Sequence, residues 1–143
     1  MMFNRTFDLY EVGETWVSRG RTITETDIVN FAGVSGDFFS LHTDKEYAKG
    51  TPFGQRIAHG LLVLSISTGL MEFVPGIIQA FYGIDHLRFT APTFIGDTIH
   101  VELEVLEKQE RKSGGLLTVR SEVKKQTEET VIRGILKLLV KAG

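Results

Sequence analysis

The chain has 143 residues, 42% hydrophobic and 24% charged, a composition that predicts a single globular domain over residues 1–143. Its net charge of −2 and its dispersed lysines and arginines argue against a nucleic-acid-binding protein. The chain has no cysteine, which excludes disulfides, thiolate metal sites and cysteine nucleophiles. With no basic, apolar leader at the N-terminus, we expect a cytoplasmic protein.

Two helix-start signals lie in the first third of the chain. The stretch Thr24–Asp27 has the spacing of a capping box and predicts a helix that Gly33 can end. The stretch Thr43–Glu46 repeats that signature and predicts a shorter helix that Gly50 closes. Residues 36–42 should therefore form a loop flanked by helices.

The longest apolar run, residues 60–73, predicts a helix that is hydrophobic almost all round. Such a helix should be buried on nearly every side, as the central helix of a small domain would be. The longest uncharged run, residues 57–71, is shorter than the roughly 20 residues that span a bilayer, so we expect no membrane association.

The second half of the chain changes to the two-residue period of strands. Apolar and polar residues alternate along two stretches that are separated by the turn signal Ser113-Gly114-Gly115, and a second turn at residues 127–130 leads into a last strand. The predicted strands are residues 16–23, 77–89, 99–105, 117–123 and the segment ending at Val140. The expected fold is α+β, an antiparallel sheet of about five strands wrapped around one apolar helix. Because such a sheet has open edges, we expect a homodimer or a higher homo-oligomer.

Asp37 and His42 are the first candidate functional residues. They place an acid and a base five residues apart, the groups needed to hold and activate a water molecule. Their apolar neighbours Phe38, Phe39 and Leu41 indicate partial burial, where pKa values shift and catalysis becomes possible. A purely structural interpretation, in which Asp37 turns the loop and His42 packs beside it, stays open.

His59 and Gly60 are the second candidate element. If the apolar helix begins near Gly60, its free backbone N–H groups favour negative charge there, and glycine lets a ligand carbonyl approach closely. The alternative is a simple helix-start glycine beside a hydrogen-bonded histidine.

The remaining polar residues are weaker candidates. His86 on a predicted strand is expected to pack or to contact a second copy, and His100 should be solvated. The four histidines have no tight spacing to one another or to a carboxylate pair, so no metal site is predicted. Ser65, like the other helix hydroxyls, is expected to bond to the backbone one turn earlier or to line a pocket.

The loop sequence G-D-F-F-S-L-H at residues 36–42 resembles the G-D-x-N-P-[IL]-H loop of the MaoC-like hydratases, the (R)-specific enoyl-CoA hydratases with a hotdog fold. The stretch Arg56–Gly60 is similar to the apolar-His-Gly element of that family. Residues 87–92 and 96–98 resemble its Arg-Phe…Pro…Gly-Asp strand and turn. The resemblance covers nearly the whole chain in the same order.

The resemblance implies a hotdog domain that reversibly hydrates a trans-2-enoyl-CoA to a (3R)-3-hydroxyacyl-CoA. Asp37 and His42 match the catalytic residues, and Gly60 matches the glycine whose N–H polarises the thioester carbonyl. The acyl-CoA is the substrate, and no metal or redox cofactor is implied. Phe39 and Ser40 replace the usual Asn-Pro, and they are expected to affect acyl specificity. An aromatic residue at this place is similar to variants in the hydratase domain of the phenylacetate ring-opening enzyme.

Two other functions remain compatible with the sequence. Hotdog folds also host acyl-CoA thioesterases, in which water is directed at the carbonyl carbon. The chain could instead be a non-catalytic acyl-CoA-binding subunit, an alternative that Phe39 and Ser40 leave open.

Overall fold

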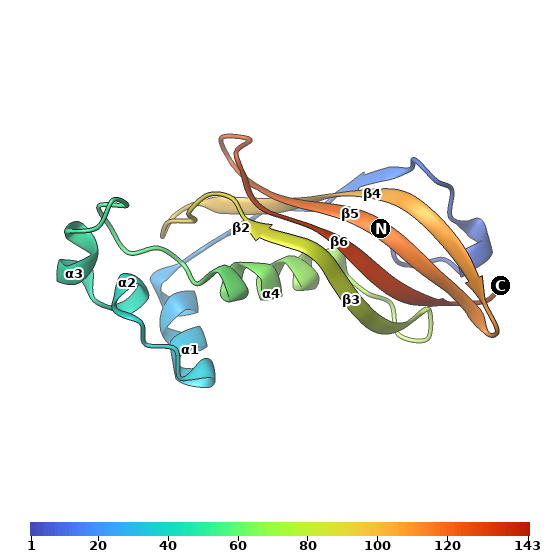
Figure 1. The fold of residues 1–143 in the computed structure, drawn as a ribbon, viewed down its shortest axis with the longest axis horizontal. Helices are drawn as coiled ribbons and strands as arrows, with labels where there is room; N and C mark the ends of the chain where they lie inside the picture. The colour runs from blue at the N-terminus through green and yellow to red at the C-terminus, as the bar shows by residue number, and fades with distance from the viewer.

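A computed structural model describes residues 1–143 as an antiparallel sheet packed on one long helix (Figure 1). The helical elements are η1 (Phe7–Leu9, a 3-10 turn), α1 (Glu25–Ser35), α2 (Ser40–Thr43), α3 (Lys45–Lys49) and α4 (Gly60–Met71). The strands are β1 (Thr15–Val17), β2 (Arg21–Thr22), β3 (Ile78–Phe89), β4 (Thr98–Arg111), β5 (Gly114–Lys125) and β6 (Thr130–Lys141). They form one six-stranded sheet in the order β1-β4-β5-β6-β3, with β2 also paired to β4. The predicted α+β class is confirmed.

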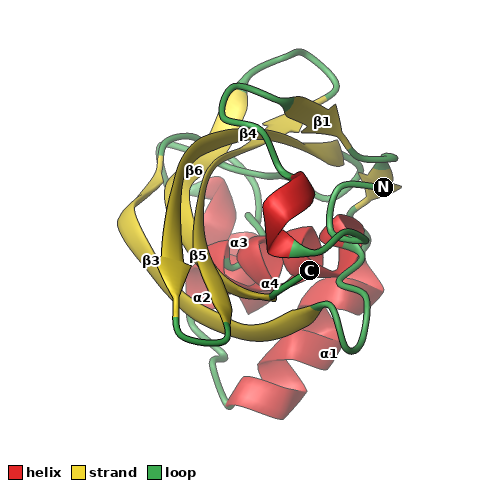
Figure 2. Ribbon diagram, turned by 90° about the vertical axis from the view of Figure 1, so that its right-hand side faces the viewer, coloured by secondary structure: helices red, strands yellow, loops and turns green.

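The sheet curls over α4, and the core lies between the two (Figure 2). The alternation predicted for β4 is present: Ile99, Val101, Leu103 and Val105 are almost completely buried, whereas the residues between them are partly exposed. The buried side chains of β4, β5 and β6 pack in one cluster with those of α4. One face of the sheet is therefore the core face, and the opposite face, here called the outer face, carries the charged residues.

The strand predicted over residues 16–23 is present in two pieces, β1 and β2, so only its continuity was predicted wrongly. At the break, the Ser18 N–H donates to the Val101 carbonyl at 2.9 Å, and the Ser18 hydroxyl accepts from the Val101 N–H at 2.8 Å. A side-chain oxygen thus replaces a backbone partner in the ladder. This break is why the sheet has six strands.

Helix α1 begins as predicted and ends later than predicted. Thr24 and Asp27 form a reciprocal capping box, in which the Thr24 hydroxyl accepts from the Asp27 N–H and the Asp27 carboxylate accepts from the Thr24 N–H. The helix continues through Gly33 and stops at Gly36, whose φ of 75° is the left-handed conformation that closes helices. Asp37 therefore follows the helix directly.

Helix α3 begins one residue later than its signature suggested. Asp44, not Thr43, is the N-cap, and its carboxylate accepts from the Tyr47 N–H at 3.0 Å. The Thr43 hydroxyl instead donates to the carbonyl of Phe38 at 3.0 Å. Gly50 closes the helix as predicted.

Helix α4 is not buried on every side within one chain. Leu62, Val63 and Leu70 are buried against the sheet, but Leu61 is 58% exposed and Ser65 is exposed. The prediction of all-round burial is therefore wrong for the single chain, which leaves one apolar edge of α4 uncovered. None of the helices combines the length and the hydrophobicity that a membrane-spanning helix requires.

Strand β3 is one edge of the sheet, because it pairs only with β6. The pairing register shifts three times along it, between Ile78 and Ala80, between Phe81 and Gly83, and between Asp85 and Arg88. Within the last irregularity, His86 has a φ of 53°, a conformation that is uncommon outside glycine. The edge is thus a long, bulged strand rather than a regular one.

Candidate active site

Asp37 and His42 lie on the short connection between α1 and α3. Asp37 is in the loop, where its carboxylate accepts from the Phe39 N–H at 3.2 Å and fixes a local turn. His42 is on the one-turn helix α2, so the predicted loop holds Asp37 but not His42. The His42 side chain turns inward and is buried, whereas Asp37 is exposed in the single chain.

The hydrogen bond of His42 defines its tautomer. Its Nδ1 lies 2.8 Å from the carbonyl oxygen of Ile57, which can only accept, so Nδ1 carries the proton of the neutral ring. The other ring nitrogen, Nε2, is then an unprotonated lone pair. A neutral imidazole with one nitrogen fixed and one free is suited to accept a proton from a bound molecule.

His59 is the N-cap of α4, as predicted, and stacks on His42 with ring centroids 4.0 Å apart. Its Nε2 lies 2.9 Å from the Asp37 carbonyl oxygen and therefore carries a proton. Its Nδ1 is buried and has no hydrogen-bond partner. His59 thus ties the Asp37 loop to the start of α4, with one nitrogen unsatisfied.

Burial lowers the pKa of His42 below its usual value of 6.5. The hydrogen bond to Ile57 and the negative charge of Asp37 oppose this effect, and the neighbouring His59 adds to it. The net direction is downward, so His42 is neutral at neutral pH and available as a base.

The histidines have no tight spacing in the sequence, but the fold brings His42 and His59 together with Asp37. One carboxylate oxygen of Asp37, one ring nitrogen of His42 and one ring nitrogen of His59 all lie within 4.8 Å of one another. Two of the four ring nitrogens already donate to carbonyl groups, which leaves only His42 Nε2 and His59 Nδ1 as lone pairs. The prediction that the site binds no metal stays a prediction.

Gly60 is the first residue of α4, and the N–H groups of Gly60, Leu61 and Leu62 have no acceptor within the chain. They give this helix end a partial positive charge. Glycine has a packing reason here as well, because a Cβ at this position would lie 2.6 Å from the Phe89 ring. The absence of a side chain at Gly60 thus lets Phe89 cover the helix end.

A mostly apolar cavity of about 230 Å³ lies beside these groups. It is lined by His42, Ile57, Ala58, Gly60, Leu61, Val63, Phe89, Ala91, Pro92, Thr93, Val131 and Ile132. His42 and Gly60 therefore face one space, and Asp37 stands next to His42 outside the lining. The cavity brings a base and a helix N-terminus together with a wall for an apolar chain.

Three other predicted site residues lie at or beyond the margin of the cavity. Phe39 is 55% exposed and meets the His42 ring edge-on, with centroids 5.6 Å apart. Ser40 opens α2 and is partly buried. The Ser65 hydroxyl donates to the Leu61 carbonyl one turn earlier, on the exposed side of α4, so Ser65 does not line the cavity.

His86 and His100 both lie away from the cavity. His86 is exposed on β3. His100 is not freely solvated as expected, because it is half-buried on the outer face of β4 with its Nε2 2.8 Å from the Glu102 carboxylate. The pKa of Glu102 is lowered mainly by this hydrogen bond and further by Lys124.

The sequence reasoning missed Ile57, Phe89 and Thr93 as parts of the site. Ile57 acts through its backbone carbonyl, which no side-chain pattern reveals. Phe89 lies in the strand and turn motif that carried the family resemblance, which was the only available signal for it.

Comparison with known proteins gives this site a context. The family model described as MaoC like domain matches residues 10–127. The protein MaoC of Klebsiella aerogenes is 41% identical over 109 residues, which are 74% of this chain and 32% of that protein. The 3-hydroxybutyryl-CoA dehydratase of Methylorubrum extorquens is 41% identical over 102 residues, which are 71% of this chain and 64% of that protein. The chain thus matches less than two thirds of the length of either relative.

Solved structures agree with these matches. The R-hydratase PhaJ1 of Pseudomonas aeruginosa is 34% identical, with a TM-score of 0.81 over 96% of this chain and 86% of that one. A protein of Mycobacterium tuberculosis with a double hotdog fold has a TM-score of 0.85 over 100% of this chain and 46% of that one. At 21% identity that likeness concerns the fold alone. The sheet wrapped on α4 is a hotdog fold, as the resemblance implied.

Proposed function

The chain belongs to the MaoC-like dehydratase family, and we propose that it reversibly hydrates a trans-2-enoyl-CoA to a (3R)-3-hydroxyacyl-CoA. The observation that carries this proposal is the state of His42. Its Nδ1 is bound to the Ile57 carbonyl, so its Nε2 is a free lone pair, and His42 lines a cavity that Gly60, at the N-terminus of α4, also lines. A base and an oxyanion donor on one apolar cavity are the groups that addition of water to a conjugated thioester needs.

In the proposed mechanism, Asp37 and His42 hold one water molecule over C3 of the substrate. His42 Nε2 takes a proton from the water while its oxygen forms the bond to C3. The electron pair of the C2–C3 double bond moves to give an enolate at the thioester. The imidazolium then returns a proton to C2, and the carbonyl re-forms, so that H and OH have been added with no other reactant. The carboxylate of Asp37 stabilises the transient imidazolium.

The free N–H of Gly60 is the proposed donor to the enolate oxygen. It lies at the positive end of α4, where negative charge is favoured, and Gly60 lines the same cavity as His42. The apolar lining lowers the local dielectric constant and strengthens that interaction. The proposed steps are proton transfers and one C–O bond, so they require no metal or redox cofactor.

A second copy of the chain is part of the proposal. Strand β3 is an open edge of 12 residues, and Tyr82 and Phe89 on it are among the exposed large hydrophobic residues. The uncovered Leu61 of α4 adds to this apolar surface. Such a surface needs a partner, and pairing of β3 with its equivalent would form a homodimer. Light scattering coupled to size exclusion should give twice the mass of the 16.0 kDa chain.

Turnover of a panel of short, medium and aromatic enoyl-CoAs tests the function. We expect loss of the conjugated thioester absorbance, a (3R) product and, in D2O, deuterium and hydroxyl on the same face, because one base serves both carbons. Release of free thiol would instead indicate a thioesterase. Binding without turnover across the panel would indicate an acyl-CoA-binding subunit, and either result would reject the hydratase proposal.

A further inference from the structure

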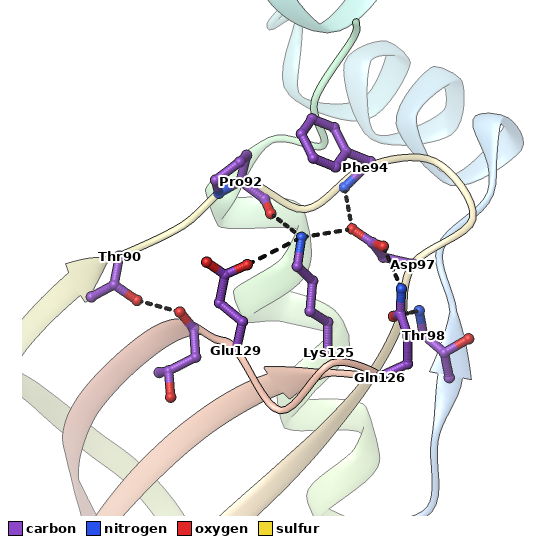
Figure 3. A network of polar contacts seen from close by, with 9 residues as sticks. Thr90, Pro92, Phe94, Asp97, Thr98, Lys125, Gln126 and Glu129 are labelled. Atoms are coloured by element: carbon purple, nitrogen blue, oxygen red, sulfur yellow. Dashed lines mark hydrogen bonds and ion pairs between the residues drawn. The ribbon is translucent and has the colours of Figure 1, made fainter. Parts of the chain in front are cut away.

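A buried ion pair lies behind the cavity without lining it. Lys125, the last residue of β5, and Asp97, in the turn before β4, have side chains that are 7% and 11% exposed. The Lys125 Nζ lies 3.2 Å from the Asp97 Oδ2 (Figure 3). Burying two charges is costly unless further hydrogen bonds complete the pair. The partners of those further hydrogen bonds therefore show which part of the chain the ion pair holds in place.

Two of the further hydrogen bonds of the pair reach residues 91–94, here called the wall segment, and the exposed carboxylate of Glu129 also lies 3.5 Å from the Lys125 Nζ (Figure 3). The Lys125 Nζ donates to the Pro92 carbonyl at 3.0 Å and lies 4.9 Å from the Phe94 ring centroid. The Asp97 Oδ2 accepts from the Phe94 N–H at 2.8 Å, and its Oδ1 accepts from Gln126 at 2.8 Å (Figure 3). Three residues of the wall segment line the cavity. The ion pair thus holds the cavity wall from behind.

The wall segment is in turn paired with the residues that precede α4. The Ala58 N–H donates to the Thr93 carbonyl at 2.8 Å, and Ile57 forms an antiparallel bridge with Phe94. The carbonyl of Ile57 is the acceptor of the His42 Nδ1–H. A continuous line of contacts therefore runs from the ion pair through the wall segment to His42.

We propose that Lys125 is a positioning residue, which with Asp97 fixes the wall segment against Ile57 and Ala58 and so holds His42 with its Nε2 free. It does not line the cavity, so its effect on the reaction passes through the wall segment. The inference rests on the proposed function only where activity is the readout. The alternative is that the pair contributes stability alone, and the two can be separated.

The test uses one single and one double variant of the full chain. Lys125→Met leaves Asp97 buried without its cation, so it should lower both stability and activity. Lys125→Met/Asp97→Asn removes both charges and should recover much of the stability. If the pair positions the site, kcat in both variants falls on the order of 100-fold, with a smaller change in KM. If kcat returns together with stability in the double variant, the pair is only structural and the proposal is wrong.

A second readout does not depend on turnover. The chain has four histidines, so the ring nitrogens of His42 can be assigned in long-range 1H–15N NMR spectra. The wild type should show one tautomer, with Nδ1 protonated, and both variants should show a mixture. An unchanged single tautomer would overturn the proposal. This result is interpretable even if the chain hydrates no enoyl-CoA.

The neighbouring lysine is a matched control. Lys124 lies on the outer face, where it pairs with Glu102 at 3.3 Å, and Lys124→Met should leave kcat and the His42 spectrum unchanged. If Lys125→Met does not fold, Lys125→Arg takes its place, because it keeps the charge but replaces a compact ammonium by a planar guanidinium. The same fall in kcat and the same mixed tautomers are expected, and their absence would contradict the proposal.

Discussion

Two regions of the molecule bring a histidine close to a carboxylate, and they do so in opposite ways. On the outer face, His100 bonds directly to the Glu102 carboxylate, which Lys124 also approaches. In the cavity, His42 bonds to a backbone carbonyl and has Asp37 only as a neighbour. We call the first the outer pair and the second the inner dyad.

The difference lies in which nitrogen is left free and where. The direct contact of the outer pair favours the charged carboxylate and uses the histidine nitrogen that faces it. The carbonyl partner of His42 fixes the ring while leaving its second nitrogen a lone pair, in a cavity that disfavours the imidazolium. His42 therefore has a free ring nitrogen and lines an apolar cavity, whereas His100 is bonded to a carboxylate on the outer face, away from that cavity.

The largest expected effect is on the hydration rate, which should depend on the inner dyad and not on the outer pair. His42→Ala and Asp37→Asn should each lower the hydration rate about 100- to 10,000-fold, the range for loss of a positioned acid or base. His100→Ala, the matched histidine control, should leave the rate unchanged. Initial rates with a short enoyl-CoA and circular dichroism of each variant check this. Activity retained in a folded His42→Ala protein would remove the basis of the comparison.

The next effect concerns the donor that faces the inner dyad. Because a Cβ at position 60 meets the Phe89 ring, the variants are made in a Phe89→Ala background. Gly60→Pro removes the N–H while remaining acceptable at the first residue of a helix, and Gly60→Ala keeps the N–H. The proline variant should be roughly 100- to 1,000-fold slower than the alanine variant, the usual loss for one oxyanion donor. Equal rates in the two variants would rule out this role for the Gly60 N–H.

The pH dependence of the inner dyad should reflect burial. His42 must be neutral to accept a proton, and its pKa is lowered from the usual value of 6.5, so the midpoint of the acid limb of kcat/KM should lie below pH 6.5. His59→Gln removes the neighbouring imidazole and should raise the pKa of His42, moving the acid limb to higher pH. NMR titration of His42 in both proteins measures the shift. A limb that moves to lower pH would contradict the assignment.

The same shift affects stability with a definite sign. The pKa of His42 is lower in the folded chain, so the unfolded chain binds the additional proton first as the pH falls below 6.5. The free energy of unfolding should therefore decrease from pH 6.5 downward through the folded pKa. In His42→Gln, which cannot titrate, this part of the loss should be missing from urea unfolding curves recorded across that range.

The smallest effect belongs to the outer pair. His100→Ala should change the free energy of unfolding by less than about 1 kcal/mol, because partly exposed ion pairs contribute little. The lowered pKa of Glu102 contributes stability that is present above about pH 4.5 and is lost as the pH falls through the folded pKa. Urea unfolding of Glu102→Gln should show a smaller loss in that acid range than the wild type. If His100→Ala lowered the free energy of unfolding at neutral pH by more than this, the outer pair would be more than a surface contact.

The parts of the site that are local in sequence could be predicted, and the parts that depend on tertiary contacts could not. The spacing of Asp37 and His42 and the glycine at the helix start are visible as motifs. The acceptor that fixes His42 is 15 residues away, and the lysine that holds the wall segment is 33 residues from Pro92. No periodicity reports such separations, because they arise only when the sheet closes over α4.

The fold shows the same division. The capping box at Thr24 and the alternation of β4 depend on neighbouring residues and were predicted. The end of α1 was not, because Gly33 and Gly36 look alike in sequence and only the second adopts the left-handed conformation. Of the two expectations for Ser65, the hydrogen bond to the backbone one turn earlier is confirmed and the position in the cavity lining is wrong. Which side of α4 the sheet covers depends on packing rather than on the apolar pattern of the run.

The irregular edge of the sheet also limits which extended chains can pair with it. A straight strand with regular hydrogen-bonding groups accepts almost any extended peptide, and this is the route to open-ended aggregates. Strand β3 interrupts its own ladder at three places, so a uniform strand cannot follow it for its whole length. Three local irregularities thereby limit pairing at an exposed edge and reduce its tendency to form open-ended aggregates.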